Sequence, residues 1–229
     1  MAEHMPGDPD ADDRFVRLDD GDMHVVEDGR PGAPGLLLIH GTAASTAWWD
    51  PVIPQLAGDC RVIRVDMAGH GRSSAPAGGY DIPAQARRAG AVLDRLGAGQ
   101  VTVIGHSTGG YVATALASAF TRPIDIPGTI IEATMGMTHR ALAVTSRASD
   151  DYLKQQTLPG RLAALGLPVL VIVGADDKRW RSTSAAAYRT VPGARLELLP
   201  GVGHTPMMED PQTTSTLLLD FAAAARHPS

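Results

Sequence analysis

Short apolar runs alternate along the chain with amphipathic segments, and this alternation predicts strands and helices in turn. Gly35–Ile39 and Val169–Gly174 are continuous apolar runs between turn-forming residues. Such runs are typical of strands that are buried on both faces of a sheet. Ile82–Leu96 instead carries its apolar residues at helical spacing, so it predicts an amphipathic helix.

The same pattern predicts the remaining elements. Further strands are expected at Arg14–Leu18, Met23–Glu27, Arg61–Val65, Val101–Gly105, Thr129–Glu132 and Arg195–Leu199. Further helices are expected at Ala47–Leu56, Gly109–Ala119, Ser182–Val191 and Pro211–Ala225. The first two strands should form an antiparallel pair around the turn Asp19-Asp20-Gly21. Because strands and helices alternate after that pair, we expect an α/β fold with a mostly parallel central sheet and helices on both faces.

The chain has no internal repeat and no long linker, so we expect a single domain over residues 14–229. Residues 1–13 are acidic and contain proline and glycine, which predicts a disordered tail. This tail has neither a basic start nor an apolar run, so we expect no signal peptide and no membrane anchor. No stretch approaches the roughly 20 apolar residues that a membrane-spanning helix needs.

Composition narrows the classes of partner. The 229 residues are 44% hydrophobic and carry a net charge of −5 without any basic run, so we expect no nucleic-acid partner. Arginine outnumbers lysine 18 to 2, a bias typical of a GC-rich bacterial genome. The single cysteine, Cys60, cannot form an intrachain disulfide, which favours a reducing, cytoplasmic location. Cys60 is expected to be a small buried side chain rather than a nucleophile.

The strongest chemical signal is Gly105-His106-Ser107-Thr108-Gly109, which lies between a predicted strand and a predicted helix. Glycine at both ends permits a tight turn that exposes the hydroxyl of Ser107. The turn also places the backbone N–H of Thr108 at a helix N-terminus, directed at the reaction centre. We therefore predict that Ser107 is a nucleophile and that Thr108 provides one donor of an oxyanion hole.

A serine hydroxyl needs a base that takes its proton, and His204 is the best of the eight histidines. It follows a predicted strand in a glycine-containing loop, whereas His4 and His227 lie in the tails. His106 lies within the turn, and its side chain should point away from Ser107. We predict that His204 is the general base.

A carboxylate should orient His204, and three candidates follow predicted strands. Asp176 and Asp177 come directly after the strand that ends at Gly174, and Glu132 ends another strand. Adjacent aspartates cannot both face the histidine, so one of the two should be solvated.

A second oxyanion donor should come from a different loop. His40-Gly41-Thr42 follows the buried strand Gly35–Ile39, and Gly41 lets the backbone bend so that an N–H faces the site. Each preorganised donor contributes roughly 3 kcal/mol of transition-state stabilisation. We predict that the second donor is the backbone N–H of Thr42.

Several motifs, in this order along the chain, resemble those of the α/β-hydrolase superfamily. They are the oxyanion loop His40-Gly41-Thr42 with Trp48-Trp49, the loop Asp66–Ser73, the nucleophile elbow Gly105–Gly109, the acid motif Gly174-Ala175-Asp176-Asp177 and the histidine loop Gly203-His204 with Glu209-Asp210-Pro211. The resemblance extends from about Phe15 to Phe221 and implies the α/β-hydrolase fold. It also implies that Asp177 is the acid and that Asp66 and His70 are structural loop residues.

The chain departs from this family between Glu132 and Pro168, where many members insert a large helical cap. Only 35 residues lie between these two positions, so we expect a reduced cap at about residues 133–160 and a comparatively open site. Six apolar side chains flank the motifs and are expected to line a substrate pocket: Trp48, Trp49, Met135, Met137, Trp180 and Met207.

Three functions are compatible with these residues. The first is a serine hydrolase that cleaves an ester, thioester or lactone of a small apolar substrate through an acyl-serine. The second is a biosynthetic lyase, cyclase or acyltransferase that uses the same Ser-His-Asp triad. The third is a non-catalytic small-molecule-binding protein. We expect no cofactor and no metal, because the histidines lack metal-ligand spacing, and a homodimer is compatible with the sequence.

Overall fold

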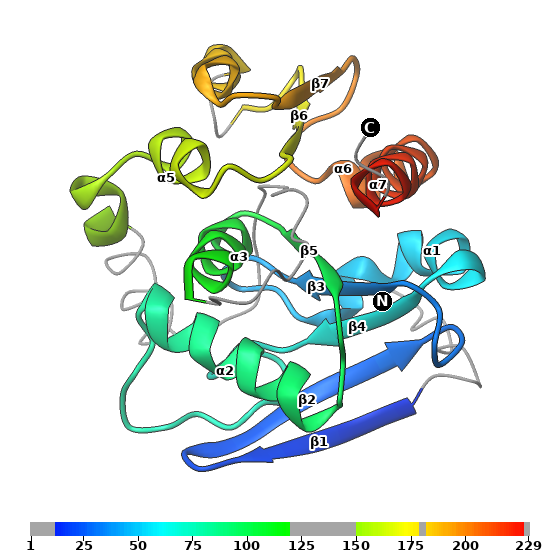
Figure 1. Cartoon of the computed structure of the whole chain (residues 1–229), viewed down its shortest axis with the longest axis vertical. Coiled ribbons are helices and arrows are strands. Elements are labelled where there is room, and N and C mark those ends of the chain that lie inside the picture. Colours follow the sequence, from blue (N-terminus) through cyan, green and yellow to red (C-terminus); the bar gives the residue numbers. More distant parts are fainter. Residues whose placement is uncertain (1–11, 120–149, 179–181, 227–229) are drawn as a thin grey trace.

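The computed structural model describes residues 12–119, 150–178 and 182–226 of the chain (Figure 1). Within these residues the strands form a five-stranded sheet in the order β1-β2-β4-β3-β5 and a two-stranded sheet, β6-β7. The strands are β1 (Asp12–Leu18), β2 (Gly21–Asp28), β3 (Gly35–Ile39), β4 (Arg61–Val65), β5 (Val101–Gly105), β6 (Leu170–Gly174) and β7 (Arg195–Leu199). In Figure 1, β1 and β2 lie at one end of the molecule and β6 and β7 at the other.

The strands after the first hairpin run parallel. β3 pairs in parallel with both β4 and β5, and β6 pairs in parallel with β7. β2 is antiparallel to β1 and to β4. At the middle of the larger sheet Leu37 lies between Ile63 and Val103, and all three side chains are fully buried. Burial on both faces explains why β3 is a continuous apolar run in the sequence.

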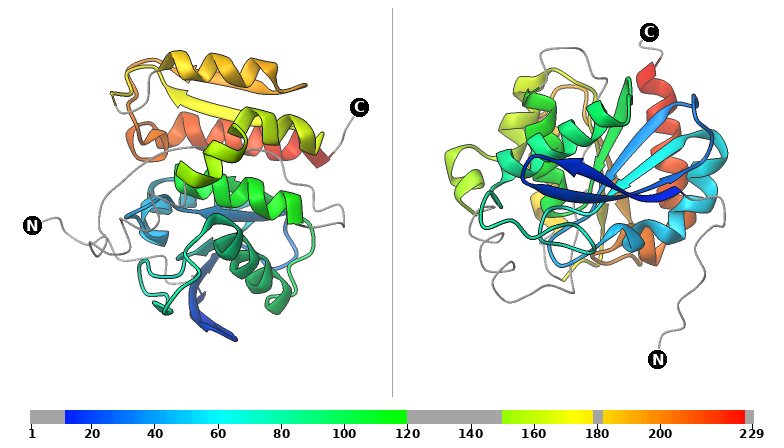
Figure 2. Two further views of the ribbon diagram at one scale, coloured as in Figure 1. Left: turned by 90° about the vertical axis from the view of Figure 1, so that its left-hand side faces the viewer. Right: turned by 90° about the horizontal axis from the view of Figure 1, so that it is seen from below.

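Helices cover both faces of the strands (Figures 1 and 2). One buried cluster joins the strands to α2 (Ile82–Arg95), α3 (Thr108–Ala119) and α5 (Leu158–Leu165). A second cluster on the other face joins them to the 3-10 helix η1 (Thr46–Val52), α1 (Ile53–Asp59) and α7 (Pro211–Arg226). The predicted α/β architecture, with a mostly parallel sheet between two helical layers, is therefore confirmed. No helix of the described ranges is both long enough and apolar enough to cross a membrane.

Several predicted boundaries need correction. The helix expected at Ala47–Leu56 is instead η1 followed by α1, because Pro51 lacks the N–H that an α-helix would use. The helix expected at Ser182–Val191 is the 3-10 helix η2 (Ser182–Thr190). The short helix α6 (Pro206–Glu209) was not predicted. The strand expected at Thr129–Glu132 lies outside the described residues.

The ends of two predicted segments also differ. The disordered tail expected over residues 1–13 is wrong at its end, because Asp12 and Asp13 already belong to β1, paired with Glu27 and Val26. Residues 1–11 lie outside the described part. Of the cap expected at about 133–160, residues 150–155 are helical and α5 begins at Leu158; residues 133–149 are not described.

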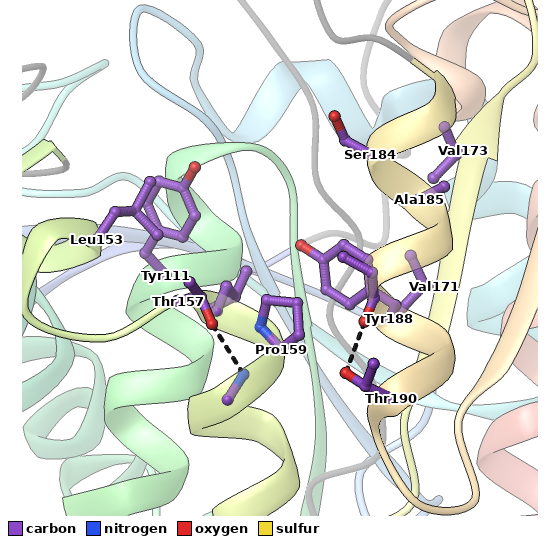
Figure 3. Close-up of a pocket in the computed structure, with 13 residues that line it drawn as sticks. Tyr111, Leu153, Thr157, Pro159, Val171, Val173, Ser184, Ala185, Tyr188 and Thr190 are labelled. Carbon is purple, nitrogen blue, oxygen red and sulfur yellow. Dashed lines mark hydrogen bonds between the residues drawn. The ribbon is translucent and has the colours of Figure 1, made fainter.

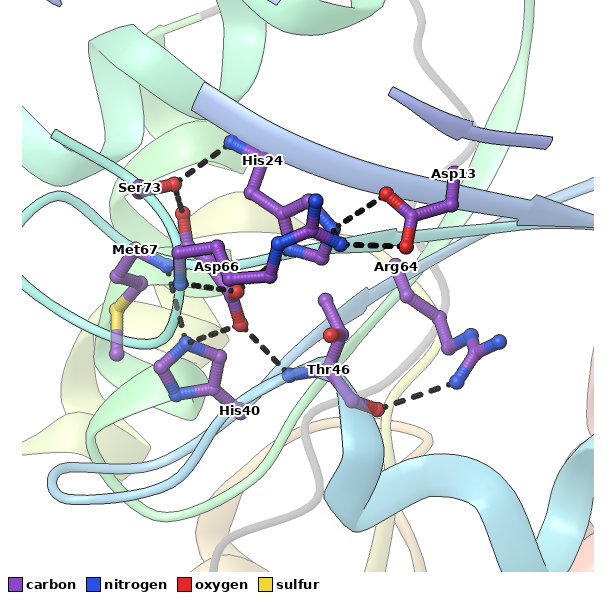
Figure 4. Close-up of polar contacts among 9 residues, drawn as sticks. Asp13, His24, His40, Thr46, Arg64, Asp66, Met67 and Ser73 are labelled. Atoms are coloured by element: carbon purple, nitrogen blue, oxygen red, sulfur yellow. Dashed lines mark hydrogen bonds and ion pairs between the residues drawn. The ribbon is translucent and has the colours of Figure 1, made fainter. Parts of the chain in front are cut away.

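A buried carboxylate ties the loop after β4 to its neighbours (Figure 4). Asp66 is 1% exposed and accepts hydrogen bonds from His24 Nδ1 (2.7 Å), the backbone N–H of Thr46 (2.7 Å) and that of Arg72 (2.9 Å). The Ser73 hydroxyl donates to the carbonyl of Asp66 at 2.6 Å and accepts from the N–H of His24 at 2.8 Å. Residues 66–73 are thereby fixed to β2 and to the start of η1.

His24 lies between two carboxylates, since its Nε2 is 2.9 Å from Asp13 Oδ1 while its Nδ1 contacts Asp66. Burial opposes the charged form of this imidazole. The hydrogen bonds to Asp66 and Asp13 outweigh that cost and raise the pKa of His24 above its ordinary value. The folded protein therefore binds this proton more tightly than the unfolded chain does.

We predict a pH-dependent contribution of His24 to stability. It is fully present below about pH 6.5, the ordinary pKa of histidine, and is lost as the pH rises through the raised pKa. The free energy of unfolding of the wild type minus that of His24→Gln should fall between about pH 6 and pH 9, as measured by urea denaturation. His70→Gln is the control, because burial lowers the pKa of His70 and reverses the sign. A constant difference for His24→Gln would contradict the prediction.

Candidate active site

The turn between β5 and α3 holds Ser107 in a strained conformation. Its φ is +53°, a region that non-glycine residues rarely occupy. The N–H of Gly109 donates to His106 O, and the N–H of Gly110 donates to Ser107 O, both at 2.8 Å. A Cβ on Gly105 would lie 2.2 Å from the carbonyl oxygen of Gly109. Glycine at position 105 is thus required for the elbow that presents Ser107.

The loop after β3 packs directly against this elbow. A Cβ on Gly109 would lie 2.2 Å from the carbonyl oxygen of Ile39 and 2.6 Å from that of His40. On the other side of the contact, a Cβ on Gly41 would lie 2.9 Å from the Cβ of Ser107. Two glycines, one from each loop, therefore allow the backbone beside Thr42 to reach the predicted nucleophile.

The structure brings His204 and Asp177 together at the ends of β6 and β7. His204 Nδ1 lies 2.9 Å from Asp177 Oδ2. The Asp177 side chain is fully buried, and that of His204 is 11% exposed. The loops can approach because Gly174 has no side chain: a Cβ there would lie 1.9 Å from the carbonyl oxygen of Gly203.

Of the candidate acids, the structure places Asp177 against the histidine. Asp176 is exposed, and its N–H donates to the carbonyl of Val202 at 3.0 Å. Glu132 lies outside the described residues. Asp177 is the aspartate that the superfamily resemblance implied, whereas strand and loop patterns alone left three carboxylates open.

Glu209 fixes the loop that carries His204. Its carboxylate accepts from the N–H of Gly203 (2.7 Å) and from the N–H and hydroxyl of Thr205 (both 2.8 Å). The residues on both sides of His204 are therefore held by one side chain from α6. Sequence reasoning noted Glu209 within the histidine-loop motif and missed this role; its spacing of six and four residues from those two amides was the available signal.

Thr42 and Thr108, the predicted oxyanion residues, are in contact. Both are buried, at 8% and 6% exposed, and their hydroxyl oxygens lie 2.5 Å apart. Among the described residues, neither backbone N–H has a hydrogen-bond acceptor. Two buried, unused N–H donors beside Ser107 are what an oxyanion hole requires.

His40 controls the direction of the Thr42 N–H. Its Nε2 accepts from the N–H of Met67 at 3.0 Å, so Nδ1 carries the proton and donates to the carbonyl of Gly41 at 2.7 Å. Complete burial, with the neighbouring His70, lowers the pKa of His40 to about 4, so the ring is neutral at neutral pH. Because the peptide bond is planar, fixing the Gly41 carbonyl directs the Thr42 N–H to the opposite side.

His106 forms a ring cluster beside the site. Its ring stacks on that of Trp48 at a centroid distance of 6.1 Å and meets the edges of the Trp49 and His204 rings at 6.2 and 6.4 Å. Burial, with nearby His204, holds the pKa of His106 well below its ordinary value. The His106 ring, which was predicted to point away from Ser107, packs against the ring of His204. In the described part of the chain, no group of three His, Cys, Asp or Glu residues could hold a metal ion.

Two of the six residues expected to line the substrate pocket lie in the core instead. Trp49 and Met207 are 0% and 1% exposed and belong to the core cluster on the α1 and α7 face, so they do not line a pocket. Their position next to loop motifs in the sequence did not reveal that they point inward. Trp48 is half-buried beside His106. Met135, Met137 and Trp180 lie outside the described residues.

A cavity of about 510 Å³ lies between α3, α5, β6 and η2 (Figure 3). Its walls are mostly apolar, with two tyrosines, Tyr111 and Tyr188, across from each other. Burial raises the pKa of Tyr111 to about 12 and also raises that of Tyr188, so both phenols are neutral at neutral pH. Sequence reasoning missed this cavity, because its lining comes from separate helices and a strand with no shared motif.

We predict that Gly41→Ala slows reaction at Ser107. The added Cβ must displace the loop from the serine by a few tenths of an ångström, and a shift of about half an ångström costs roughly tenfold in rate. The rate of labelling by a fluorophosphonate measures this effect. Gly58→Ala is the matched control, since a Cβ at Gly58 in α1 would meet nothing within 4 Å. Equal labelling rates for the two variants would contradict the described packing.

Comparisons with known proteins agree with the fold described above. The family model of the alpha/beta hydrolase fold matches residues 34–161. A Bacillus subtilis protein provisionally assigned as a 2-succinyl-6-hydroxy-2,4-cyclohexadiene-1-carboxylate synthase is 22% identical over 90% of this chain and 97% of its own length. Lipase LipV of Mycobacterium tuberculosis is 33% identical over 65% of this chain and 59% of its own length. The crystal structure of a bacterial membrane phospholipase A superimposes with a TM-score of 0.80 at 21% identity, over 95% of this chain and 87% of that one. The chain belongs to the alpha/beta-hydrolase family and is an enzyme of the hydrolase type.

Proposed function

We propose that the protein is a serine hydrolase that cleaves an ester, thioester or lactone of a small apolar substrate through an acyl-serine. The observation that carries this proposal is the contact between His204 Nδ1 and the fully buried Asp177 carboxylate, 2.9 Å apart. Because Nδ1 donates to that carboxylate, Nε2 of the neutral ring is the nitrogen available as a base. The strained Ser107 lies in the adjoining turn, whose His106 ring contacts that of His204.

The first half of the reaction follows from these positions. Ser107 Oγ attacks the substrate carbonyl carbon while His204 Nε2 takes the hydroxyl proton. The carbonyl oxygen becomes an oxyanion that accepts from the N–H groups of Thr42 and Thr108. Asp177 stabilises the imidazolium, which then protonates the departing alkoxide oxygen or thiolate sulfur. The acyl group remains on Ser107.

The second half repeats these steps with water. His204 takes a proton from a water molecule, which attacks the acyl carbon and forms a second oxyanion in the same hole. Collapse of that intermediate returns the proton to Ser107 Oγ and releases the carboxylic acid. No other group has to change its charge, because burial keeps His40 and His106 neutral.

The preference for an apolar substrate is supported by the cavity between α3 and η2 (Figure 3). Tyr111 follows Ser107 by four residues, about one turn of α3. The other lining residues include the first three of α5 and Val173, the last residue of β6 before Gly174. These residues place part of the cavity near the carboxyl end of β6, on the side of the sheet where α/β proteins bind their ligands. No charged side chain is among the described residues that line it, so this part of the cavity suits a neutral apolar group.

A second candidate is a lyase, cyclase or acyltransferase that uses the same three residues. The observation that favours it is the similarity to the Bacillus subtilis protein provisionally assigned as a synthase, which extends over 90% of this chain. The two candidate functions differ in the products that they release from p-nitrophenyl esters. A hydrolase releases p-nitrophenol and free acid from p-nitrophenyl esters with repeated turnover, whereas an acyltransferase needs an alcohol or amine acceptor for release of the acyl group. A lyase or cyclase accumulates neither product.

We predict that a fluorophosphonate adds one label per chain, on Ser107, and that p-nitrophenyl esters of short acyl chains are turned over. Mass spectrometry of the labelled peptide identifies the residue, and Ser107→Ala is the control that should lose both label and turnover. A label on another residue, or none on folded wild-type protein, would refute the assignment of the nucleophile.

We predict that Asp177→Asn lowers the acylation rate by about 10⁴-fold, because the amide no longer selects the tautomer with a proton on Nδ1. Asp176→Asn is the matched control: the residue is adjacent and exposed, so its rate should stay within about tenfold of the wild type. Stopped-flow measurement of the p-nitrophenol burst separates acylation from later steps. A larger defect in Asp176→Asn than in Asp177→Asn would show that the acid is assigned wrongly.

A further inference from the structure

The two residues whose amides border Ser107 also share a side-chain contact. Thr42 Oγ1 and Thr108 Oγ1 lie 2.5 Å apart although the residues are separated by 66 positions in the sequence. One comes from the loop after β3 and the other from the first turn of α3. Both residues are more than nine-tenths buried. The two halves of the predicted oxyanion hole are therefore joined by a hydroxyl–hydroxyl hydrogen bond.

This pair has one more hydrogen-bond donor than the contact between the two hydroxyls uses. Each threonine hydroxyl carries one hydrogen, and the contact between the two oxygens uses one of the two. In the described part of the chain, neither hydroxyl contacts any acceptor besides the other. A buried donor without an acceptor destabilises the protein, so an acceptor that arrives with the substrate would satisfy it. The buried hydroxyl of Thr114, by contrast, donates to the carbonyl of Gly110 in its own helix at 2.8 Å.

We propose that the Thr42–Thr108 hydroxyl pair supplies a third hydrogen-bond donor to the oxyanion of the tetrahedral intermediate, in addition to the two backbone N–H groups. The proposal rests on the proposed function, because it assigns a side-chain role within the same site. The spare hydrogen belongs to whichever hydroxyl accepts in the pair. That hydroxyl belongs to the same residue as one of the two amides, so its hydrogen lies within a few bonds of a backbone donor.

The chemistry favours a role in the transition state over one in substrate binding. A hydroxyl that already accepts a hydrogen bond is polarised and becomes a better donor. Its bond to a neutral ester carbonyl is of ordinary strength, whereas its bond to an oxyanion is charge-assisted and roughly twice as strong. The contact between the two threonines also fixes the donor before reaction, so little reorganisation is needed as charge develops. Removing it should therefore lower kcat and leave KM nearly unchanged.

The alternative is that the pair serves merely as a latch between the two loops. The two roles predict different patterns among single variants. A latch fails equally when either hydroxyl is removed, so both single variants should match the double variant. A donor resides on one residue, so one single variant should match the double variant while the other retains most of the rate.

The test compares Thr42→Val, Thr108→Val and the double variant with the two serine variants, which keep the hydroxyl. The readouts are the second-order rate of fluorophosphonate labelling at Ser107, kcat and KM for p-nitrophenyl acetate, and the thermal midpoint. One valine variant and the double variant should lose on the order of 10²-fold in labelling rate and kcat, with KM within about threefold. The serine variants should stay within about threefold of wild type. Threonine-to-alanine variants replace any valine variant that does not fold.

Two results would overturn the proposal while the proposed function stands. In the first, wild type is labelled at Ser107 and both valine variants react within about threefold of it. In the second, all three hydroxyl-free variants slow equally and lose thermal stability together, which is the pattern of a latch. Absence of labelling in folded wild-type protein would instead refute the proposed function, and the third donor with it.

Discussion

The site depends on one packing constraint, the direct approach of the backbone after β3 to the backbone that begins α3. The carbonyl oxygens of Ile39 and His40 occupy the space that a side chain at position 109 would need. At the same contact, the N–H of His106 donates to the carbonyl of Ile39 at 2.9 Å. This backbone contact brings Thr42 against Thr108 and Gly41 against Ser107. A comparable contact between Gly174 and Gly203 unites the loops of Asp177 and His204.

Burial then determines which groups near Ser107 can carry charge. His40 is held neutral and fixed in one tautomer by contacts on both nitrogens. His106, although it adjoins the serine, is also neutral because the apolar rings of Trp48 and Trp49 surround it. His204 differs from both because a buried carboxylate faces its Nδ1. In the proposed mechanism the positive charge that develops during acylation therefore resides on His204, and the negative charge lies among the donors of Thr42 and Thr108.

Much of this arrangement could be predicted from the sequence. β3, β4, β5 and β7 begin and end where the sequence pattern placed them. Burial on two faces explains the mostly apolar composition of β3, β4 and β5, whereas β7 is only partly buried. The loops that carry the site residues could be predicted, because glycine recurs where two backbones must approach each other. The inward direction of Trp49 and Met207 was not foreseen, since a loop residue beside a motif can point either way. The contact of Asp13 with His24 depends on the pairing of two strands, whereas the contacts of Glu209 are local and their spacing was overlooked. The cavity beside α3 has no contiguous signature in the sequence.

The central claim is that two loops, from β3 and from β5, enclose one anion position beside Ser107. The most direct measurement is a crystal structure of the protein after reaction with a phosphonate inhibitor, which mimics the tetrahedral intermediate. The account predicts a covalent bond from Ser107 Oγ to phosphorus, with one phosphoryl oxygen about 2.7–3.1 Å from the backbone nitrogens of both Thr42 and Thr108. A phosphoryl oxygen directed to solvent, or held by any other pair of donors, would contradict it.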